Sequence, residues 1–131
     1  MKPEELLYAE THEWIAVEET GGEKTATLGL SAFAVELLTD LVYIELPTVG
    51  QLVEARQPFC VVESVKAVSD VYSPVAGEVV AVNDALPDAL ETLSADAYGA
   101  GWIAKIKISD ASGLANLLDF AAYQKQCEEA Q

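Results

Sequence analysis

The residue of this sequence best suited to chemistry is Lys66, which lies in the segment Ser64-Val65-Lys66-Ala67. Apolar runs typical of strands flank this segment, "PFCVVE" before it and "VSDVYS" after it. A four-residue connection of this kind is most often built around a type I turn. The pattern predicts a β-hairpin with the lysine ammonium in water at its tip, where a lysine usually does no more than solvate the turn.

Two features favour a chemical role for this lysine. Val65 is a large apolar residue at a tip where hairpins prefer Asn, Asp or Gly. In addition, the segments "LPTVGQLVEA" (46–55) and "SPVAGEVVAV" (73–82) echo each other on either side of the lysine. Such an echo is what a pseudo-twofold β-sandwich would give, with the hairpin where its two halves meet. A free amine at the end of a rigid β-module suits the covalent attachment of a mobile cofactor arm.

The strands that must position this hairpin are visible as alternation of apolar and polar residues. The segments "TATLGL" (25–30), "VYIEL" (42–46) and "AKIKI" (104–108) alternate in this way, which predicts half-buried strands. In "VYIEL" the alternation puts Val42 and Ile44 on one face. Gly and Pro turn signals separate the runs, and many short strands with regular turns favour a sandwich or flattened barrel.

Two helices complete the predicted elements of a single domain over residues 1–131, with a β core of about 11–108. Ser31 can cap a short helix near residues 32–40. Asp110 or Ser112 can cap a C-terminal helical segment of about residues 111–129, whose apolar stripe indicates core packing.

Charge and composition exclude several classes of function. Seven basic residues against twenty-two acidic ones give a net charge of −15, which argues against binding nucleic acid or an anionic membrane. The same charge favours docking to positively charged partner surfaces. With two cysteines and one histidine, no metal site is expected. We also find no Ser/His/Asp set, paired acid and base, or phosphate-binding loop, so no catalytic residues are expected.

The N-terminus has no apolar stretch of the kind that signal peptides carry, and no run in the chain approaches the roughly 20 residues of a membrane span. We therefore expect a soluble protein, located in the bacterial cytoplasm, or in the mitochondrial matrix if this is a processed organellar protein. The sequence leaves the oligomeric state open, and a monomer is the default expectation.

Four motifs carry a resemblance to a known family: "THEWI" (11–15), "ELPTVG" (45–50), "ESVKAVSDVYSPVAGEVVAVNDAL" (63–86) and "YGAGWIAKIKISD" (98–110). Together they resemble the H protein of the glycine cleavage system. A biotin carrier would have methionine on each side of the lysine, and a 2-oxoacid dehydrogenase lipoyl domain an aspartate before it, whereas Val65 and Ala67 flank Lys66 here. The resemblance implies a lipoyl/biotinyl-type flattened β-barrel sandwich of two antiparallel sheets with pseudo-twofold symmetry.

The same resemblance implies site residues. Lys66 corresponds to the lysine that carries lipoic acid in amide linkage, and Glu63 to an acidic position that the lipoylating enzyme recognises. Thr11, Glu13 and Asp70 correspond to positions beside the cleft that receives the loaded arm, where a carboxylate could pair with the ammonium of the bound group. His12 belongs to the same motif, and we interpret it as a packing residue.

The implied function is that of a non-catalytic carrier. Its lipoyl arm would shuttle an aminomethyl group between glycine decarboxylase, aminomethyltransferase and dihydrolipoyl dehydrogenase. A lipoyl or octanoyl transferase, or a lipoate ligase, would attach the arm. Two alternatives stay open, namely an H-like protein that mainly hands lipoyl groups to other enzymes and an unmodified structural domain.

Overall fold

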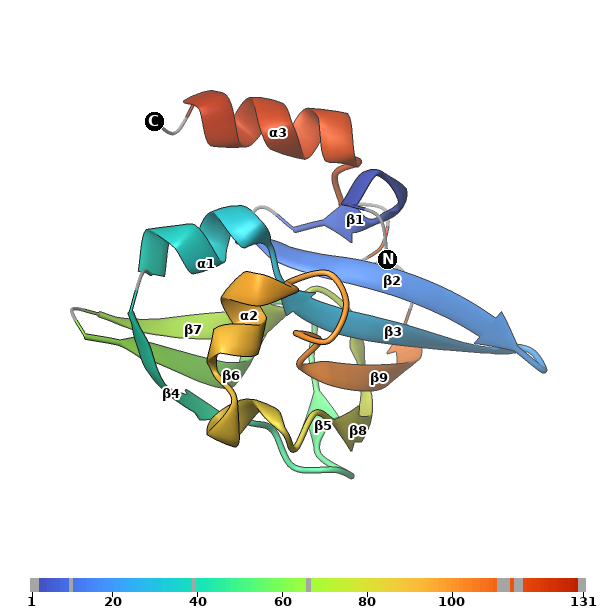
Figure 1. Ribbon diagram of the computed structural model, residues 1–131. Helices are drawn as coiled ribbons and strands as arrows, with labels where there is room; N and C mark the ends of the chain where they lie inside the picture. Colours follow the sequence, from blue (N-terminus) through green and yellow to red (C-terminus); the bar gives the residue numbers. More distant parts are fainter. Residues whose placement is uncertain are drawn as a thin grey trace.

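The computed structural model describes residues 3–9, 11–38, 40–65, 67–110, 114 and 117–129, so Lys66 lies outside the described residues. Two antiparallel sheets make up most of it (Figure 1). The larger sheet has six strands, in the spatial order β1 (Leu7–Tyr8), β2 (Glu13–Thr20), β3 (Glu23–Leu30), β9 (Ala104–Asp110), β8 (Ala76–Val82) and β5 (Leu52–Val53). The smaller sheet has three, in the order β4 (Leu41–Glu45), β6 (Gln57–Ser64) and β7 (Val68–Ser73).

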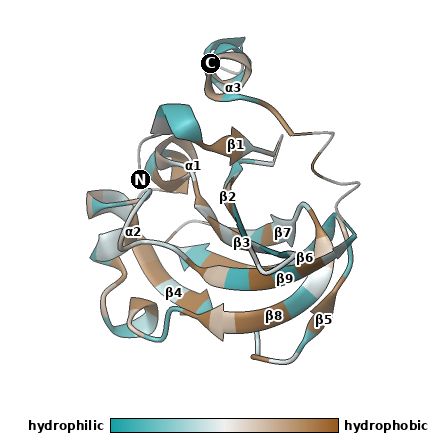
Figure 2. Cartoon of the chain, turned by 90° about the vertical axis from the view of Figure 1, so that its right-hand side faces the viewer, coloured by the Kyte–Doolittle hydropathy of each residue, from teal (hydrophilic) through white to brown (hydrophobic). Residues whose placement is uncertain are grey.

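The prediction of a mainly β fold with two antiparallel sheets is confirmed, although the sheets do not close into a barrel. Their facing sides bury a core that includes Leu28, Val62, Val71, Val79 and Ile106, each fully buried. Figure 2 shows the apolar stretches of β3, β8 and β9 as brown bands. Alternation predicted the positions of β3 and β9 correctly, because both strands place one face on this core. The prediction of half-burial holds for β9 but not for β3, which is buried on both faces from Ala26 to Leu30.

The two echoing segments lie side by side at one end of the larger sheet. Strand β5 pairs with β8, and the Gly50 N–H donates to the Val79 carbonyl at 2.7 Å. Antiparallel pairing of this kind is compatible with a local two-fold axis. The echo does not extend to burial, however, because Val53 is buried whereas its counterpart Val80 is exposed.

Three α-helices and two 3₁₀ turns occur within the described residues: η1 (Pro3–Glu5), α1 (Ala32–Leu38), η2 (Leu86–Asp88), α2 (Glu91–Ala95) and α3 (Phe120–Glu129). Helix α1 confirms the helix predicted near residues 32–40, although it ends at Leu38. Helix α2 was not predicted. None of the described helices has the length and apolar character that a membrane crossing requires.

The C-terminal helix is shorter than the predicted segment 111–129, because α3 begins only at Phe120. Leu118 instead forms an isolated bridge with Tyr8, with backbone hydrogen bonds of 2.8 and 2.7 Å. Asp119 then caps the helix, since its Oδ1 accepts the Ala122 N–H at 2.8 Å. The apolar residues before the helix are therefore used in packing and in pairing with β1, while residues 111–113, 115 and 116 lie outside the described residues.

The hairpin predicted around the lysine is formed by β6 and β7, which pair in the register Glu63↔Val68. Strand β6 includes Ser64 and β7 begins at Val68, so the connection is residues 65–67, one residue shorter than predicted. The Ser64 N–H donates to the Ala67 carbonyl at 2.8 Å. The Val65 N–H donates to the Asp40 carbonyl at 3.0 Å, which fixes the end of the hairpin to the start of β4.

Candidate functional site

The end of the β6–β7 hairpin is strongly exposed on both sides of the lysine position. The side chains of Val65 and Val68 are 72% and 66% exposed, and Ala67 is also exposed. Apolar side chains in such positions contribute little to the fold, since almost none of their surface is removed from water. Attachment of a cofactor at Lys66 stays a prediction, because the lysine itself lies outside the described residues.

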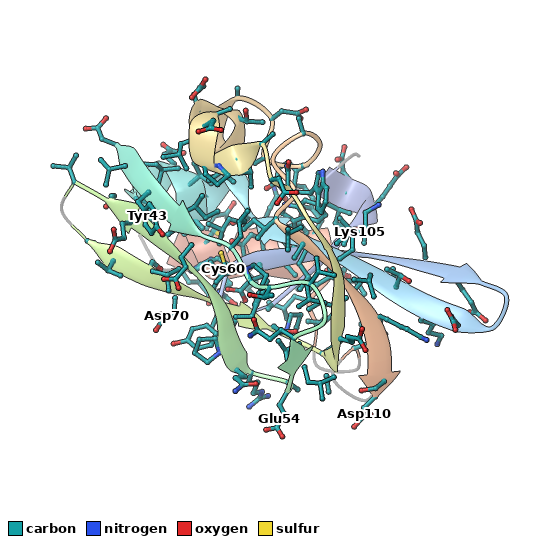
Figure 3. The ribbon with its side chains drawn as sticks, turned by 90° about the horizontal axis from the view of Figure 1, so that it is seen from below. Tyr43, Glu54, Cys60, Asp70, Lys105 and Asp110 are labelled. Atoms are coloured by element: carbon teal, nitrogen blue, oxygen red, sulfur yellow. The ribbon has the colours of Figure 1, made fainter. Side chains whose placement is uncertain are left out.

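The two predicted acidic residues of the hairpin lie on the outer face of the smaller sheet. Glu63 is half-buried between Tyr43 of β4 and Val68 of β7. Asp70 is exposed and lies opposite Val61, two residues before Glu63 on β6. Figure 3 shows Asp70 and Tyr43 on this outer side, with Cys60 toward the interior. The face presents negative charge beside the hairpin end.

Glu13 is the most unusual group of the site, because it is an acidic side chain that is only 1% exposed. It is the first residue of β2, and its carboxylate accepts the Thr11 O–H and the Tyr72 N–H, the latter at 3.3 Å. Burial raises the pKa of Glu13 to about 7, and the hydrogen bonds from Thr11 and Tyr72 oppose that rise. Within the described part of the chain no cationic side chain pairs with it.

Tyr72 was not identified as a site residue from the sequence. Its contribution is a backbone N–H on β7, the last strand of the smaller sheet, and it comes from a residue 59 positions away from Glu13. Every residue except proline has a backbone N–H, so this donor could not be identified from the type of the residue. The hydrogen bond joins the two sheets at the buried carboxylate.

The structure therefore brings together some of the predicted cleft residues but not all of them. Thr11 and Glu13 are in direct contact, beside Tyr72 of β7. Asp70 lies two residues earlier on the same strand, and its side chain is exposed. Glu63 is on the central strand β6, apart from the Thr11–Glu13 pair.

His12 lies between Thr11 and Glu13 in the sequence, and it has a positive φ of 79° and a half-buried side chain. Its Nδ1 lies 2.7 Å from the Tyr123 hydroxyl, which in turn lies 2.5 Å from Ser31 Oγ. Burial lowers the pKa of His12 and so favours the neutral imidazole. These contacts support the interpretation of His12 as a packing residue. Ser31 was predicted only as a helix cap, and Tyr123 was not identified, because both meet His12 only through the tertiary fold.

Facing antiparallel sheets with an exposed hairpin around a single lysine position define the lipoyl-type class of β-domain. The model of the family "Glycine cleavage H-protein" matches residues 6–130. The chain belongs to this family.

Named relatives agree with this membership. A glycine cleavage system H protein of Rhodopirellula baltica is 62% identical over 128 residues, which cover 98% of this chain and 96% of the relative. One of Shewanella loihica is 54% identical over 127 residues, covering 97% and 96%. The crystal structure of a glycine cleavage system H protein from Mycobacterium marinum superimposes with a TM-score of 0.85 at 36% identity, covering 95% of this chain and 98% of that one.

Proposed function

We propose that this chain is the lipoyl-bearing carrier of the glycine cleavage system, with lipoic acid in amide linkage on Lys66. The observation that carries this proposal is the family match over residues 6–130, which contains the whole β6–β7 hairpin. The exposed hairpin end supports it, because an enzyme that attaches a cofactor needs free access to the amine. Amide formation removes the lysine charge, so the modified chain is still more acidic.

The residues of the chain fit such a group. When bound, a lipoyl group supplies a ring disulfide that is strained relative to the relaxed dihedral of about 90° and therefore easily reduced. The buried Glu13 carboxylate, with a hydroxyl donor beside it, is complementary to the ammonium of an aminomethyl cargo. In this position Glu13 holds the cargo by charge, and the surrounding protein limits access of water to it.

Glu13 has a second property that suits this role. Its pKa of about 7 means that the carboxyl is partly neutral before the cargo arrives. An ammonium nearby favours the charged form, so binding of the cargo completes the ionisation of Glu13. The empty site thereby avoids a fully buried, unpaired charge.

The partners we propose are glycine decarboxylase, aminomethyltransferase and dihydrolipoyl dehydrogenase, together with the transferase or ligase that attaches the lipoyl group. The exposed carboxylate of Asp70 and the half-buried one of Glu63 lie on the hairpin that these enzymes would have to reach. They suit partner surfaces that carry basic residues. The chain itself then acts as a carrier without catalytic residues, as a monomer in the cytoplasm.

Intact-mass measurement of the protein purified from its native source tests the attachment. We expect the mass of one lipoyl or octanoyl amide per chain. Co-expression with a lipoylating enzyme should modify the wild type and leave Lys66→Arg unmodified with an unchanged unfolding midpoint. Lys24→Arg, an exposed lysine on β3, is the matched control and should be modified normally. Modification of Lys66→Arg would contradict the assignment.

Glycine–bicarbonate exchange with the decarboxylase separates the shuttle from a protein that only hands on lipoyl groups. The lipoylated chain should support exchange. A modified chain that supports none would favour the lipoyl-relay alternative.

A further inference from the structure

The C-terminal helix and the residues just before it make three contacts with β1 and with the corner at residues 11–13 that leads into β2. Leu118, just before α3, pairs through its backbone with Tyr8 of β1. The Tyr123 ring of α3 stacks on the Tyr8 ring, with centroids 4.5 Å apart and planes 5° from parallel. The Tyr123 hydroxyl reaches His12 Nδ1 at 2.7 Å. Figure 1 shows α3 above β1, on the side of β2 away from the smaller sheet.

The hydrogen bonds around Tyr123 fit a direction that runs from Ser31 through Tyr123 to a neutral His12. Ser31 Oγ accepts the Ala34 N–H at 3.2 Å, and its own hydroxyl hydrogen is then free to point to Tyr123. Tyr123 in turn donates to Nδ1 of a neutral His12. This order gives the hydroxyls of Ser31 and Tyr123 and Nδ1 of His12 a partner each, and the burial that lowers the pKa of His12 favours the neutral imidazole that it requires.

His12 needs this support because its backbone is in the left-handed region, at φ 79°. A non-glycine residue adopts that conformation at a cost and persists in it only where surrounding contacts determine it. The conformation has a direct effect on its neighbours. It turns the chain so that the Thr11 hydroxyl lies on the Glu13 carboxylate, while Glu13 remains the first residue paired in β2.

We propose that Tyr123 is a positioning residue for Glu13: through its hydrogen bond to His12, the C-terminal helix holds the Thr11–Glu13 corner in the conformation that buries the carboxylate beside β7. This inference deepens the proposed function and rests on it for its consequence, the protection of an ammonium cargo. The positioning itself is a property of the unmodified chain. Tyr123 acts at a distance, since its hydroxyl contacts His12 and Ser31 and not the carboxylate.

The test is the pKa of the Glu13 side chain, measured by ¹³C NMR of the carboxyl carbon in the full-length, unlipoylated protein. Tyr123→Phe keeps the stacking on Tyr8 and removes only the hydroxyl. We expect the Glu13 pKa to fall by about one unit from its value of about 7, because a released corner exposes the carboxyl to water. An unchanged Glu13 pKa in Tyr123→Phe would overturn the proposal.

Tyr98→Phe is the matched control. It removes another hydroxyl of the same aromatic cluster, one that accepts the Ala32 N–H at 3.0 Å. It should destabilise the fold to a similar extent and leave the Glu13 pKa in place. An equal fall in both variants would mean that loss of packing, and not the His12 bond, moves Glu13.

His12→Asn provides a second, independent variant. Asparagine tolerates the left-handed conformation but is too short to replace the bond to Tyr123. We expect Tyr123→Phe to have little further effect on the Glu13 pKa in this background. A full additional fall would show that Tyr123 acts by a route other than His12 and would contradict the proposal.

These outcomes are separate from those of the proposed function. If Glu13→Gln leaves the lifetime of the aminomethyl-loaded protein unchanged, the role of Glu13 in protecting the cargo is wrong, while the positioning by Tyr123 can still stand. If the NMR result fails, the carrier function is unaffected.

Discussion

At the scale of single residues, Glu13 is the most unusual group of this protein. Its carboxyl is buried and accepts hydrogen bonds from the Thr11 hydroxyl and the Tyr72 backbone amide. The ionised form of a carboxyl group is costly in such a place without a cation, and this cost is what raises its pKa. With a pKa of about 7, Glu13 is present in both its neutral and its ionised form near neutral pH. Thr11 matters to this arrangement because its hydroxyl is the side-chain donor to the Glu13 carboxylate.

The raised pKa of Glu13 predicts how stability depends on pH. Burial raises the pKa from 4.5 to about 7, so the folded state binds a proton more tightly than the unfolded state. The resulting stabilisation is complete below pH 4.5 and is lost as the pH rises through about 7, by on the order of 3 kcal/mol. Glu13→Gln cannot titrate, so its unfolding free energy should lack this decline.

Urea unfolding of the wild type and of Glu13→Gln at pH 4.5, 6 and 8 measures the two unfolding free energies. The other acidic residues titrate in both proteins, so their contribution cancels in the difference. Parallel profiles for the two proteins would show that Glu13 titrates normally in the folded state.

Residue types alone could lead only part of the way to this site. The turn pattern singled out Lys66, whereas Glu63, Asp70, Thr11 and Glu13 were identified through the resemblance. Of these four, Thr11 and Glu13 are in contact. Tyr72 could not be identified, because it contributes a main-chain N–H. Tyr123 could not be either, because it lies 111 residues from His12 along the chain.

At the scale of elements, the sequence predicted strands best where alternation was regular. Strand β4 shows where this reasoning fails. Val42 was expected to share the buried face of Ile44, yet it is exposed while Ile44 is buried. The register between β4 and β6 shifts between Leu41 and Tyr43, and such a bulge reverses the side on which a residue points.

Strand β8 yields a prediction at the same scale. Gly77 pairs with Ile108 of β9, and a Cβ added to it would lie 2.1 Å from the Lys107 carbonyl oxygen. Because that neighbour is backbone, it cannot move aside without disturbing the strand. Gly77→Ala should therefore destabilise the protein by about 3 kcal/mol in urea unfolding.

Val80→Ala, at an exposed position of the same strand, serves as the control and should cost less than about 1 kcal/mol. A Gly77→Ala protein as stable as this control would mean that β8 and β9 can separate locally without loss.

At the scale of the whole molecule, the net charge of −15 sets how the protein meets its partners. An excess of one sign steers association with oppositely charged surfaces, and salt weakens that steering. We expect kcat/KM of the partner enzymes, measured with this chain as the varied substrate, to fall roughly tenfold between 50 and 300 mM NaCl. Sucrose at matched viscosity should have a much smaller effect, and a flat salt profile would contradict electrostatic steering.

The mainly β architecture could be predicted at this scale, but the membership of the larger sheet could not. Its strands pair across long stretches of sequence, as in the register Thr25↔Lys107 between β3 and β9. Which strands become neighbours depends on how all apolar faces are buried together, and local alternation carries no information about that choice.

The contact between Glu13 and Tyr72 also bears on aggregation. Strand β7 ends the smaller sheet, so its outward N–H and C=O groups could serve as a template for a strand from another chain. Glu13, the first residue of β2, already accepts the Tyr72 N–H that such a strand would need, and its burial shows that the protein itself covers this part of the β7 edge. The side chain proposed to hold the cargo thus also blocks intermolecular strand addition at this point of the β7 edge.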